Sequence, residues 1–534
     1  MHSLKKHLSE SKTASQWANI GIRQHAGINL PLSALRSKNS SGIGEFYDLI
    51  PLITWCKELN IDVIQLLPLN DTGSDPSPYN ALSSCAIHPI YLSLHKLPYL
   101  KDPDLIKKIE ELEELNSFDL LEFQTVRTRK THVFHAYVEK YGSKILNSSS
   151  YADFINQNSW LQPYALFQVL QHEMGHTDFF SWPKEFKYIT PQKFQELIET
   201  RATELSFYII LQYLCFEQLS QVKAYANKNG VFLKGDIPIL ISPNSADVWF
   251  HPEFFNTDLT VGAPPDQYCK EGQNWGFPGF RWDDMKKTDF SWWKQRLQYA
   301  SSFYDIYRID HAIGLFRLWC IPPGHKSIEG FFIPGNEHLW GPHGLNLLNL
   351  LISSSSMLPI AEDLGVVPSV VRPILEDLGI PGTKVMRWER DWKHDKHFID
   401  PKEYPKISLT CVSTHDSPTL EQWWRDFPEE ASVYAKQNGW LYTPQITYQI
   451  RQAILKESAH SSSLFHINLL SEYLALLPEF VALNPDEERI NVPGTQLSSN
   501  WSYKFRKSIE EITSSPELKE EMKKIIIQKQ DLQS

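Results

Sequence analysis

Several features that mark other protein classes are missing from this sequence of 534 residues. No apolar run approaches the roughly 18 residues that a membrane-spanning helix needs. No apolar segment follows the first two lysines, so no secretory signal is expected. The sequence has no CxxC pair, and its cysteines are scattered at Cys56, Cys85, Cys215, Cys269, Cys320 and Cys411. Scattered cysteines are typical of reduced thiols, so the sequence predicts a cytoplasmic protein.

The charge balance shows no excess of basic residues. The chain has 52 lysines and arginines against 63 aspartates and glutamates, which gives a net charge of −11. This acidity argues against nucleic acid and against an anionic membrane as partners. With 42% hydrophobic and 22% charged residues, the chain can bury a core and is not disordered. Aromatic residues reach 13%, and their apolar faces suit stacking on sugar rings.

Short β-rich runs alternate with helical patterns along much of the chain. Seven runs are predicted as strands: 27–32, 62–69, 231–239, 304–310, 358–364, 382–388 and 408–414. Because helical patterns separate most of them, they are typical of parallel βαβ units. Seven strands are close to the eight of a (β/α)8 TIM barrel. The sequence therefore predicts an α/β barrel, although no run marks the eighth strand.

The uneven spacing of these strands predicts large insertions. About 160 residues separate the second and third runs, which is too long for one crossover. Helical periodicity within this stretch predicts a helical insertion at approximately 100–200. The segment at approximately 244–293 is rich in Gly, Pro and Trp and is predicted as an ordered loop over the active site. The part at approximately 417–534 has a mainly helical pattern, so we expect one catalytic unit over 1–534 without a C-terminal β-sandwich domain.

Acidic residues recur at the ends of the predicted strands. Strand alternation sends Arg308 and Asp310 to the same face, where the arginine is expected to keep the carboxylate ionised. Glu362 ends another strand, and partial burial near a second carboxylate would give it the raised pKa of a general acid. Its neighbour Asp363 points the opposite way and is expected to brace a loop or cap a helix. Asp236 also ends a strand, so these acids are predicted to meet at the active-site rim of the barrel.

A further strand end carries His415 and Asp416. This pair can hold vicinal hydroxyls and place negative charge near a cationic carbon. Ser417 and Pro418 are predicted to begin the next helix as its N-cap and first residue, which leaves the pair free. No Cys/His metal cluster and no glycine-rich phosphate loop accompany these residues. Carboxylates with arginine, histidine and aromatics, without metal or phosphate machinery, indicate glycoside chemistry.

The order of these motifs resembles that of the α-amylase clan: Arg-x-Asp, then Glu, then His-Asp on successive barrel strands. More specifically, the chain is similar to the 4-α-glucanotransferases (amylomaltases or disproportionating enzymes) of glycoside hydrolase family 77. The resemblance runs in order from about residue 20 to residue 501. The matching stretches are 27–32 (GINLPL), 41–44 (SGIG), 65–69 (QLLPL), 77–79 (SPY), 235–238 (GDIP), 245–249 (SADVW), 262–266 (GAPPD), 272–276 (GQNWG), 308–311 (RIDH), 361–365 (AEDLG), 414–416 (THD) and 491–495 (NVPGT).

The resemblance implies a transferase that moves α-1,4-glucan segments with retention of configuration. It implies that Asp310 is the nucleophile, Glu362 the acid and base, and Asp416 the third carboxylate, which stabilises the transition state. Arg308 would orient Asp310. Substrate-binding positions are predicted at Ser77, Tyr79, Asp236, Asp266, Gln273, Trp275, Arg308, His311, His415 and Asn491.

The resemblance implies no cofactor and no metal. The expected partners are maltodextrins, glucose or glycogen-type glucans, because the chain shows neither a starch-binding module nor the C-terminal β domain of amylases. The segment 262–275 resembles the family's lid, and its Pro-Pro pair limits its flexibility. Such a lid is expected to exclude water and to position the acceptor.

Three alternatives stay open. A plain α-glucan hydrolase of the same clan would share the three acids, and a non-catalytic glucan-binding protein would share the fold. His172-Glu-Met-Gly-His176 fits the HExxH signature of zinc metallopeptidases, which places both histidines on one helix face with Glu173 as general base. The product distribution with glucose or maltose added as acceptor separates a transferase from a hydrolase.

Overall fold

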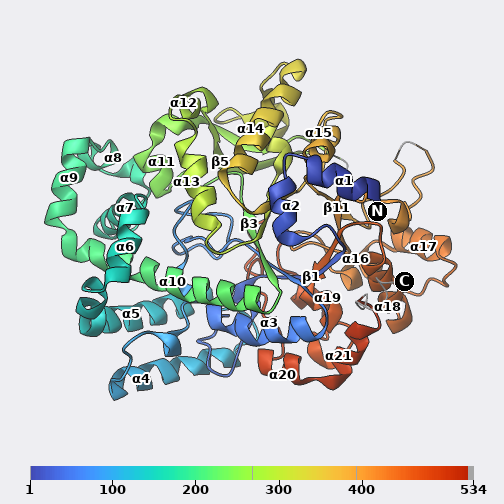
Figure 1. Ribbon diagram of the computed structural model, residues 1–534, viewed down its shortest axis with the longest axis horizontal. Helices are drawn as coiled ribbons and strands as arrows, with labels where there is room; N and C mark the ends of the chain where they lie inside the picture. The colour runs from blue at the N-terminus through green and yellow to red at the C-terminus, as the bar shows by residue number, and fades with distance from the viewer. Residues whose placement is uncertain (1, 267–268, 393, 527–534) are drawn as a thin grey trace.

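The computed structural model describes residues 2–266, 269–392 and 394–526, with a ring of parallel strands near its centre (Figure 1). The eight-stranded sheet has the order β10-β11-β12-β1-β2-β3-β6-β9. At its two ends, the amide of Ala361 in β9 donates to the carbonyl oxygen of Pro381, just before β10, at 2.8 Å, which closes the ring. The strands are β1 (His25–Leu30), β2 (Val63–Leu66), β3 (Phe232–Ile237), β6 (Ile306–Ile309), β9 (Leu358–Ala361), β10 (Gly382–Val385), β11 (Ser408–Cys411) and β12 (Phe465–Leu469).

The barrel predicted from the sequence is confirmed, and seven of its strands overlap the predicted runs. The eighth strand, β12, lies within the part beyond residue 417, which was expected to be mainly helical. It has five residues and all of them are buried, with β11 and β1 on either side. Its apolar and polar residues alternate as in a strand, but the run is short, and its polar members His466 and Asn468 are buried as well.

Most of the helices that connect the barrel strands bury an apolar stripe. In the first of them, apolar residues at positions 49, 52, 53 and 56 follow the i, i+3, i+4, i+7 spacing of one helix face, and all four are buried. These connecting helices are α3 (Leu49–Glu58), α10 (Ala202–Lys228), α13 (Ser291–Ala300), α14 (Trp340–Ser354), α15 (Val371–Leu378) and α18 (Tyr448–Ala459).

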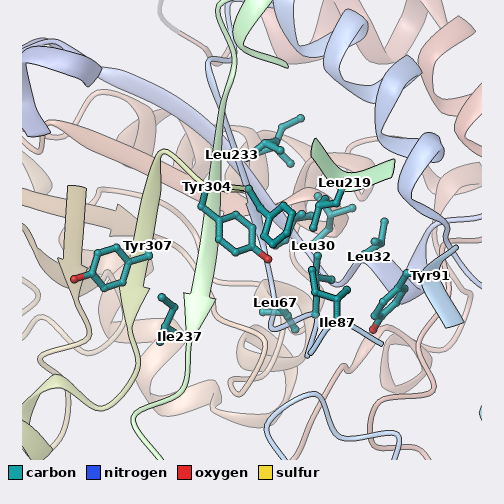
Figure 2. Close-up of a cluster of buried hydrophobic side chains, with 14 of the residues drawn as sticks. Leu30, Leu32, Leu67, Ile87, Tyr91, Leu219, Leu233, Ile237, Tyr304 and Tyr307 are labelled. Carbon is teal, nitrogen blue, oxygen red and sulfur yellow. The ribbon is translucent and has the colours of Figure 1, made fainter. Parts of the chain in front are cut away.

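Large apolar side chains fill the space around β3, and Figure 2 shows Leu233, Ile237 and Tyr304 among them. Gly235 provides room for this packing. A Cβ atom added there would lie 2.5 Å from the Tyr304 ring, which is too close for two carbon atoms. Glycine therefore lets the ring lie against β3 directly before Asp236, the first acid of the site.

The segment predicted as a helical insertion is built from helices, which gather at one side of the barrel (Figure 1). Lys130 of α5 anchors them to the barrel: its side chain is fully buried, and its Nζ lies 2.7 Å from Glu45 Oε1 in the segment after β1. The helices are α4 (Pro103–Glu110), α5 (Phe123–Leu146), α6 (Ser149–Gln157), α7 (Leu161–Glu173), α8 (Lys184–Lys187) and α9 (Pro191–Thr200).

The segment 244–293 differs from the loop expected there. It contains an antiparallel hairpin, β4 (Phe255–Ala263) with β5 (Gln273–Phe280), flanked by α11 (Ala246–Phe250) and α12 (Trp282–Lys287). With β7 (Leu318–Ile321) and β8 (Phe331–Ile333), the hairpin forms a second sheet of order β5-β4-β7-β8. Glycine and proline are depleted in most strands, and their frequency here concealed the hairpin.

The two ends of the chain add further helices to the barrel (Figure 1). After β12, the described residues up to 526 contain helices and turns but no strand. None of the described helices is both long and apolar enough to cross a membrane. The helices before β1 and after β12 are α1 (His2–Glu10), α2 (Ala14–Ile20), α19 (Leu470–Leu474), α20 (Ile509–Ser514) and α21 (Pro516–Lys523), whereas α16 (Leu420–Asp426) and α17 (Pro428–Gln437) lie between β11 and β12.

Candidate active site

Arg308 lies at the centre of a cluster of acidic side chains at the carboxyl ends of the barrel strands. Its register partner on β3 is Asp236. Arg308 Nη1 lies 2.7 Å from Asp236 Oδ2 and 2.9 Å from Asp310 Oδ1, while Nη2 lies 2.9 Å from Glu362 Oε2. One guanidinium therefore holds the acids that end β3, β6 and β9, three neighbouring strands of the barrel.

The acids of this cluster differ in their exposure to solvent. The side chain of Asp236 is 0% exposed, whereas those of Asp310 and Glu362 are each 22% exposed and that of Asp416 is 38% exposed. The three predicted catalytic carboxylates thus open to the site. Asp236 was predicted as a substrate-binding position, and the structure places its buried side chain behind Arg308.

The single positive charge of Arg308 does not balance the acids around it. Burial raises the pKa of Asp310 well above its usual value; Arg308 opposes this rise, and Glu362, Asp236 and Asp416 add to it. Arg308 was expected to keep Asp310 ionised, and it does favour the charged form, but this one cation faces several carboxylates. Interacting carboxyl groups titrate together, and a cluster that retains a proton can supply both a protonated acid and an ionised nucleophile.

His311 follows the nucleophile position in a left-handed backbone conformation, with φ of +46°. Its amide donates to Glu362 Oε2 at 2.7 Å and so fixes one oxygen of the predicted acid. Burial lowers the pKa of His311 to about 4. The ring is therefore neutral near pH 7 and can both donate to and accept from a sugar hydroxyl.

The adjacent acids at the end of β9 diverge as predicted. Glu362 joins the arginine cluster, whereas Asp363 is 1% exposed. Asp363 Oδ1 accepts from the Thr383 amide at 2.7 Å, and Oδ2 accepts from Arg372 Nε at 2.8 Å. Asp363 therefore braces the junction of β9 with β10, and it does not cap a helix.

Asp416 belongs to a second network, at the end of β11. Asn491 Nδ2 donates to Asp416 Oδ1 at 2.6 Å, and His415 Nε2 lies 3.1 Å from Oδ2. Burial acts to raise the pKa of Asp416, but His415, Asn491 and Arg308 outweigh it and lower this pKa to about 2. Asp416 is therefore ionised near neutral pH, as a charge-stabilising carboxylate must be.

Tyr79 joins the two networks. Its hydroxyl donates to Asp236 Oδ2 at 2.8 Å and lies 2.9 Å from His415 Nε2. The Tyr79 ring also stacks on the His415 ring, with centroids 5.4 Å apart. Because the hydroxyl proton goes to Asp236, His415 Nε2 must carry the hydrogen of its bond to Tyr79. Ser77 is half-buried in the same loop, and its amide donates to Asp75 Oδ1 at 2.8 Å.

Ser417 does not cap the next helix, contrary to the prediction. Its hydroxyl accepts from the Thr414 amide at 2.8 Å and so closes the turn at the end of β11. The N-cap of α16 is Thr419, which forms a capping box with Gln422. The Ser-Pro pair therefore shapes the turn that carries the His-Asp motif, and the helix begins two residues after Pro418.

The β4–β5 hairpin carries three of the predicted substrate-binding residues, Asp266, Gln273 and Trp275. Trp275 Nε1 donates to Gln273 Oε1 at 3.0 Å, and the Trp275 ring meets the His311 ring edge-on, with centroids 4.8 Å apart. Both residues therefore lie beside the acid cluster. Asp266 Oδ1 accepts from the Cys269 amide at 2.7 Å and shapes the hairpin tip. The predicted lid 262–275 includes residues 267 and 268, which lie outside the described residues.

Two residues that contact this site were not predicted. Trp501 packs against Tyr79, with ring centroids 5.7 Å apart. Arg489 Nη2 donates to the carbonyl oxygen of Asp416 at 2.9 Å, and its Nε donates to that of Asn491 at 2.7 Å. Arg489 thus ties the segment of Asn491 to the third carboxylate. Proximity to the NVPGT motif was the only sequence signal for either residue.

The HExxH pattern does not form a helical metal site. Helix α7 ends at Glu173, and His176 lies beyond it with φ of +61°. Arg201 Nε donates to Glu173 Oε1 at 2.7 Å and so engages the supposed general base. In the part of the chain that the structure describes, no group of three or more His, Cys, Asp or Glu side chains is placed to hold a metal ion. The helical geometry on which the metallopeptidase alternative depended is therefore not formed.

A parallel barrel whose acids converge at the carboxyl ends of its strands defines a carbohydrate-processing barrel enzyme. A family model described as 4-alpha-glucanotransferase, that of glycoside hydrolase family 77, matches residues 30–510. The chain belongs to this family, and the family predicted from the sequence is confirmed. It is an enzyme with the activity of the family, 4-alpha-glucan transfer.

Known proteins resemble the chain over nearly its full length. The 4-alpha-glucanotransferase of Chlamydia pneumoniae is 44% identical over 511 residues, which cover 95% of this chain and 96% of that protein. The 4-alpha-glucanotransferase of Chlamydia trachomatis serovar D is 38% identical over 514 residues, covering 96% and 97%. Among solved structures, the amylomaltase of Streptococcus agalactiae in complex with acarbose has a TM-score of 0.80 at 23% identity, covering 94% of this chain and 98% of that one. This likeness shows that the two share the barrel fold.

Proposed function

We propose that the enzyme moves α-1,4-glucan segments from a maltodextrin donor to the 4-hydroxyl of glucose or of another maltodextrin by a retaining double displacement. Asp310 acts as nucleophile, Glu362 as acid and base, and Asp416 as third carboxylate. One observation carries this assignment: Arg308 holds Asp310 and Glu362 at 2.9 Å on its two terminal nitrogens, while both acids keep 22% of their side chains exposed. Carboxyl groups held so close together suit a covalent intermediate.

In the first step, an oxygen of Asp310 attacks the anomeric carbon of the donor while the bond from that carbon to the glycosidic oxygen breaks. Glu362 gives its proton to the leaving oxygen, so the released segment carries a free 4-hydroxyl. Positive charge develops at the anomeric carbon, and Asp416 stabilises it because its lowered pKa keeps it ionised. The product of this step is a glucosyl ester of Asp310.

In the second step, the 4-hydroxyl oxygen of an acceptor attacks the anomeric carbon and the ester bond to Asp310 breaks. Glu362, now a carboxylate, takes the proton of that hydroxyl, which restores both acids to their starting states. Two displacements at one carbon return the α configuration. The His311 amide holds Glu362 Oε2 in both steps, and the neutral His311 ring binds a sugar hydroxyl.

Asp236 takes a positioning role in this proposal. Its buried carboxylate receives hydrogen bonds from Arg308 and from Tyr79, which in turn contacts His415. Asp236 therefore orients the cation that holds Asp310 and the histidine that holds Asp416, without touching the sugar. This arrangement is supported by its 0% exposed side chain.

Transfer requires a sugar hydroxyl to reach the intermediate before water does. Trp275 projects from the β4–β5 hairpin against His311 and offers an apolar face for an acceptor sugar. We assign the hairpin the task of excluding water and orienting the acceptor. We assign Gln273 and Asp266 to the acceptor side of the site as well, and we assign Ser77 to the loop that carries Tyr79.

The proposed substrates are maltodextrins and glycogen-type glucans, and the proposed location is the cytoplasm. All six cysteines are free thiols, which supports a reducing compartment.

The test is a product analysis with maltotriose as the only sugar, beside Asp310→Asn and the control Asp104→Asn on the surface of α4. We expect glucose and a ladder of longer maltodextrins from the wild-type enzyme and the control. Asp310→Asn should lower the rate about 10⁴-fold, because the covalent step is lost. Shorter sugars alone would identify a hydrolase, and activity retained in Asp310→Asn would remove the nucleophile assignment.

A further inference from the structure

Lys234 is a buried cation within the barrel that the mechanism above does not use. It stands two residues before Asp236 on β3, so the two side chains project from the same face of the strand. The residue is 1% exposed, and its Nζ donates to Oε1 of Gln65, its register partner on β2, at 2.6 Å. Within the described part of the chain, its ammonium bonds to this neutral amide and forms no ion pair with a carboxylate.

A small cavity connects Lys234 with the catalytic cluster. It has a volume of about 30 Å³, and its lining includes Lys234, Gln65, Arg308, Glu362 and Cys411. This volume is sufficient for a water molecule with polar partners on several sides. The ammonium of Lys234 can therefore act on the pair of Arg308 and Glu362 across one water, without contact with the sugar.

The acids around Lys234 partly offset the cost of burying a cation at this position. The titratable groups that face it are Asp236 on its own strand, Arg308 on β6, Glu362 at the end of β9 and Cys411 on β11. The acids favour the charged ammonium, whereas burial and Arg308 disfavour it. The acid cluster holds more carboxylates than Arg308 can balance, so a second cation beneath it favours their ionisation.

We propose that Lys234 is a positioning residue that supplies this second positive charge to the acid cluster and so sets the pH at which the cluster releases the proton that must leave before the nucleophile can attack. The inference rests on the catalytic roles proposed above. Burial lowers the pKa of Lys234 to about 7. Its charge is therefore present below about pH 7 and is lost above it, so its effect belongs to the acid side of the activity profile.

The experiment compares full-length wild-type enzyme with Lys234→Met by measuring kcat/KM for maltotriose between about pH 4 and pH 9. Without the ammonium, the acid cluster retains its shared proton up to a higher pH. We expect the midpoint of the acid limb to move up by about 0.5 to 1 pH. The loss of activity should be about 3- to 10-fold larger at pH 5 than at pH 8, where the wild-type lysine is neutral as well.

The matched control is Lys504→Met, which removes another buried lysine. Lys504 is 4% exposed, and its Nζ bonds to the backbone carbonyl oxygens of Leu115 and Phe118, away from the acid cluster. The acid limb of the Lys504→Met enzyme should match that of the wild-type enzyme. If thermal unfolding shows that Lys234→Met does not fold, Lys234→Gln is measured in its place. This variant removes the charge but keeps a hydrogen-bond donor for Gln65.

An acid limb that stays in place in a folded Lys234 variant would overturn the inference, even if kcat falls, because a purely structural role lowers activity equally at every pH. Lys234→Arg keeps a cation and should return the limb toward that of the wild-type enzyme. Asp310→Asn is measured in parallel. If that variant stays active, the proposed nucleophile fails; if it is inactive and the limb is unmoved, the Lys234 inference alone fails.

Discussion

The barrel rim and the β4–β5 hairpin hold their parts of the site in different ways. At the rim, Arg308 bonds to Asp310 and Glu362, and Asn491 bonds to Asp416, so each predicted catalytic carboxylate has a fixed partner. On the hairpin, the Trp275 indole bonds to the side chain of Gln273, two residues away, and meets the rim through a ring contact with His311.

In the proposed mechanism, the acids that make and break bonds follow barrel strands directly, whereas the residues assigned to the acceptor stand on a hairpin of the second sheet. Changes at the rim should therefore reduce the rate of the chemical steps. Changes on the hairpin should alter the choice between acceptor and water. Three variants test this contrast, in order of decreasing loss of activity.

Glu362→Gln should give the largest loss among them. A neutral amide cannot protonate the leaving sugar oxygen, so kcat with maltotriose should fall about 10³-fold or more. A donor whose leaving group needs no proton, such as α-glucosyl fluoride, should lose far less in its first step. The exposed Glu376→Gln in α15 serves as control and should match the wild-type enzyme. Equal losses with both donors would show that Glu362 is not the acid.

Asn491→Ala should give an intermediate loss. The variant removes the bond to Asp416 Oδ1, and a lost hydrogen bond to a charged group corresponds to roughly a 10- to 100-fold fall in kcat. The pKa of Asp416 should rise from its value of about 2 because one stabilising donor is gone. Since this pKa remains below neutrality, the loss at pH 7 reflects orientation and not protonation.

The check for Asn491→Ala is a pH profile of kcat from about pH 3 to pH 8. Asn438→Ala, which removes a surface amide near the end of α17, is the matched control. We expect the midpoint of the acid limb to move to higher pH and the plateau of kcat near neutral pH to fall. An unchanged plateau would show that the carboxyl group of Asp416 is oriented without Asn491.

Trp275→Ala should give the smallest loss of activity. It should affect the reaction with the acceptor more than the first step. Losing an aromatic face that stacks on sugar should raise the KM for an acceptor about 5- to 10-fold. It should also increase the share of hydrolysis, while release of the first product from the donor stays close to the wild-type rate. The control is Trp392→Ala, a change at a partly exposed tryptophan in the segment after β10. A fall in the first step without a change in the hydrolysed share would place Trp275 on the donor side.

The positions of the proposed catalytic acids were predictable from the sequence because they depend on local rules. An acid that follows a buried strand lies at the carboxyl end of that strand, and a parallel barrel gathers all such ends at one rim. Arg308 and Asp310 required only strand alternation. Asp363 was separated from Glu362 by the same alternation, although its partners Thr383 and Arg372 were not visible.

Other features depended on segments far apart in the sequence. Asn491 and Asp416 are 75 residues apart, and Arg489 ties their backbones together. The raised pKa of Asp310 comes from burial and from carboxylates that end other strands. The eighth strand β12 shows the same limit, because an alternation of only five residues is a weak signal without its pairing with β11 and β1.

The sequence by itself determined the barrel class, the family and the order of the catalytic acids, since these follow from short patterns read along one strand at a time. Only the tertiary structure decided that Asp236 lies behind Arg308 and that Lys234 faces the acid cluster from within the barrel. The exposure of a buried group and the charges around it depend on side chains from many strands. No local sequence pattern specifies these contacts.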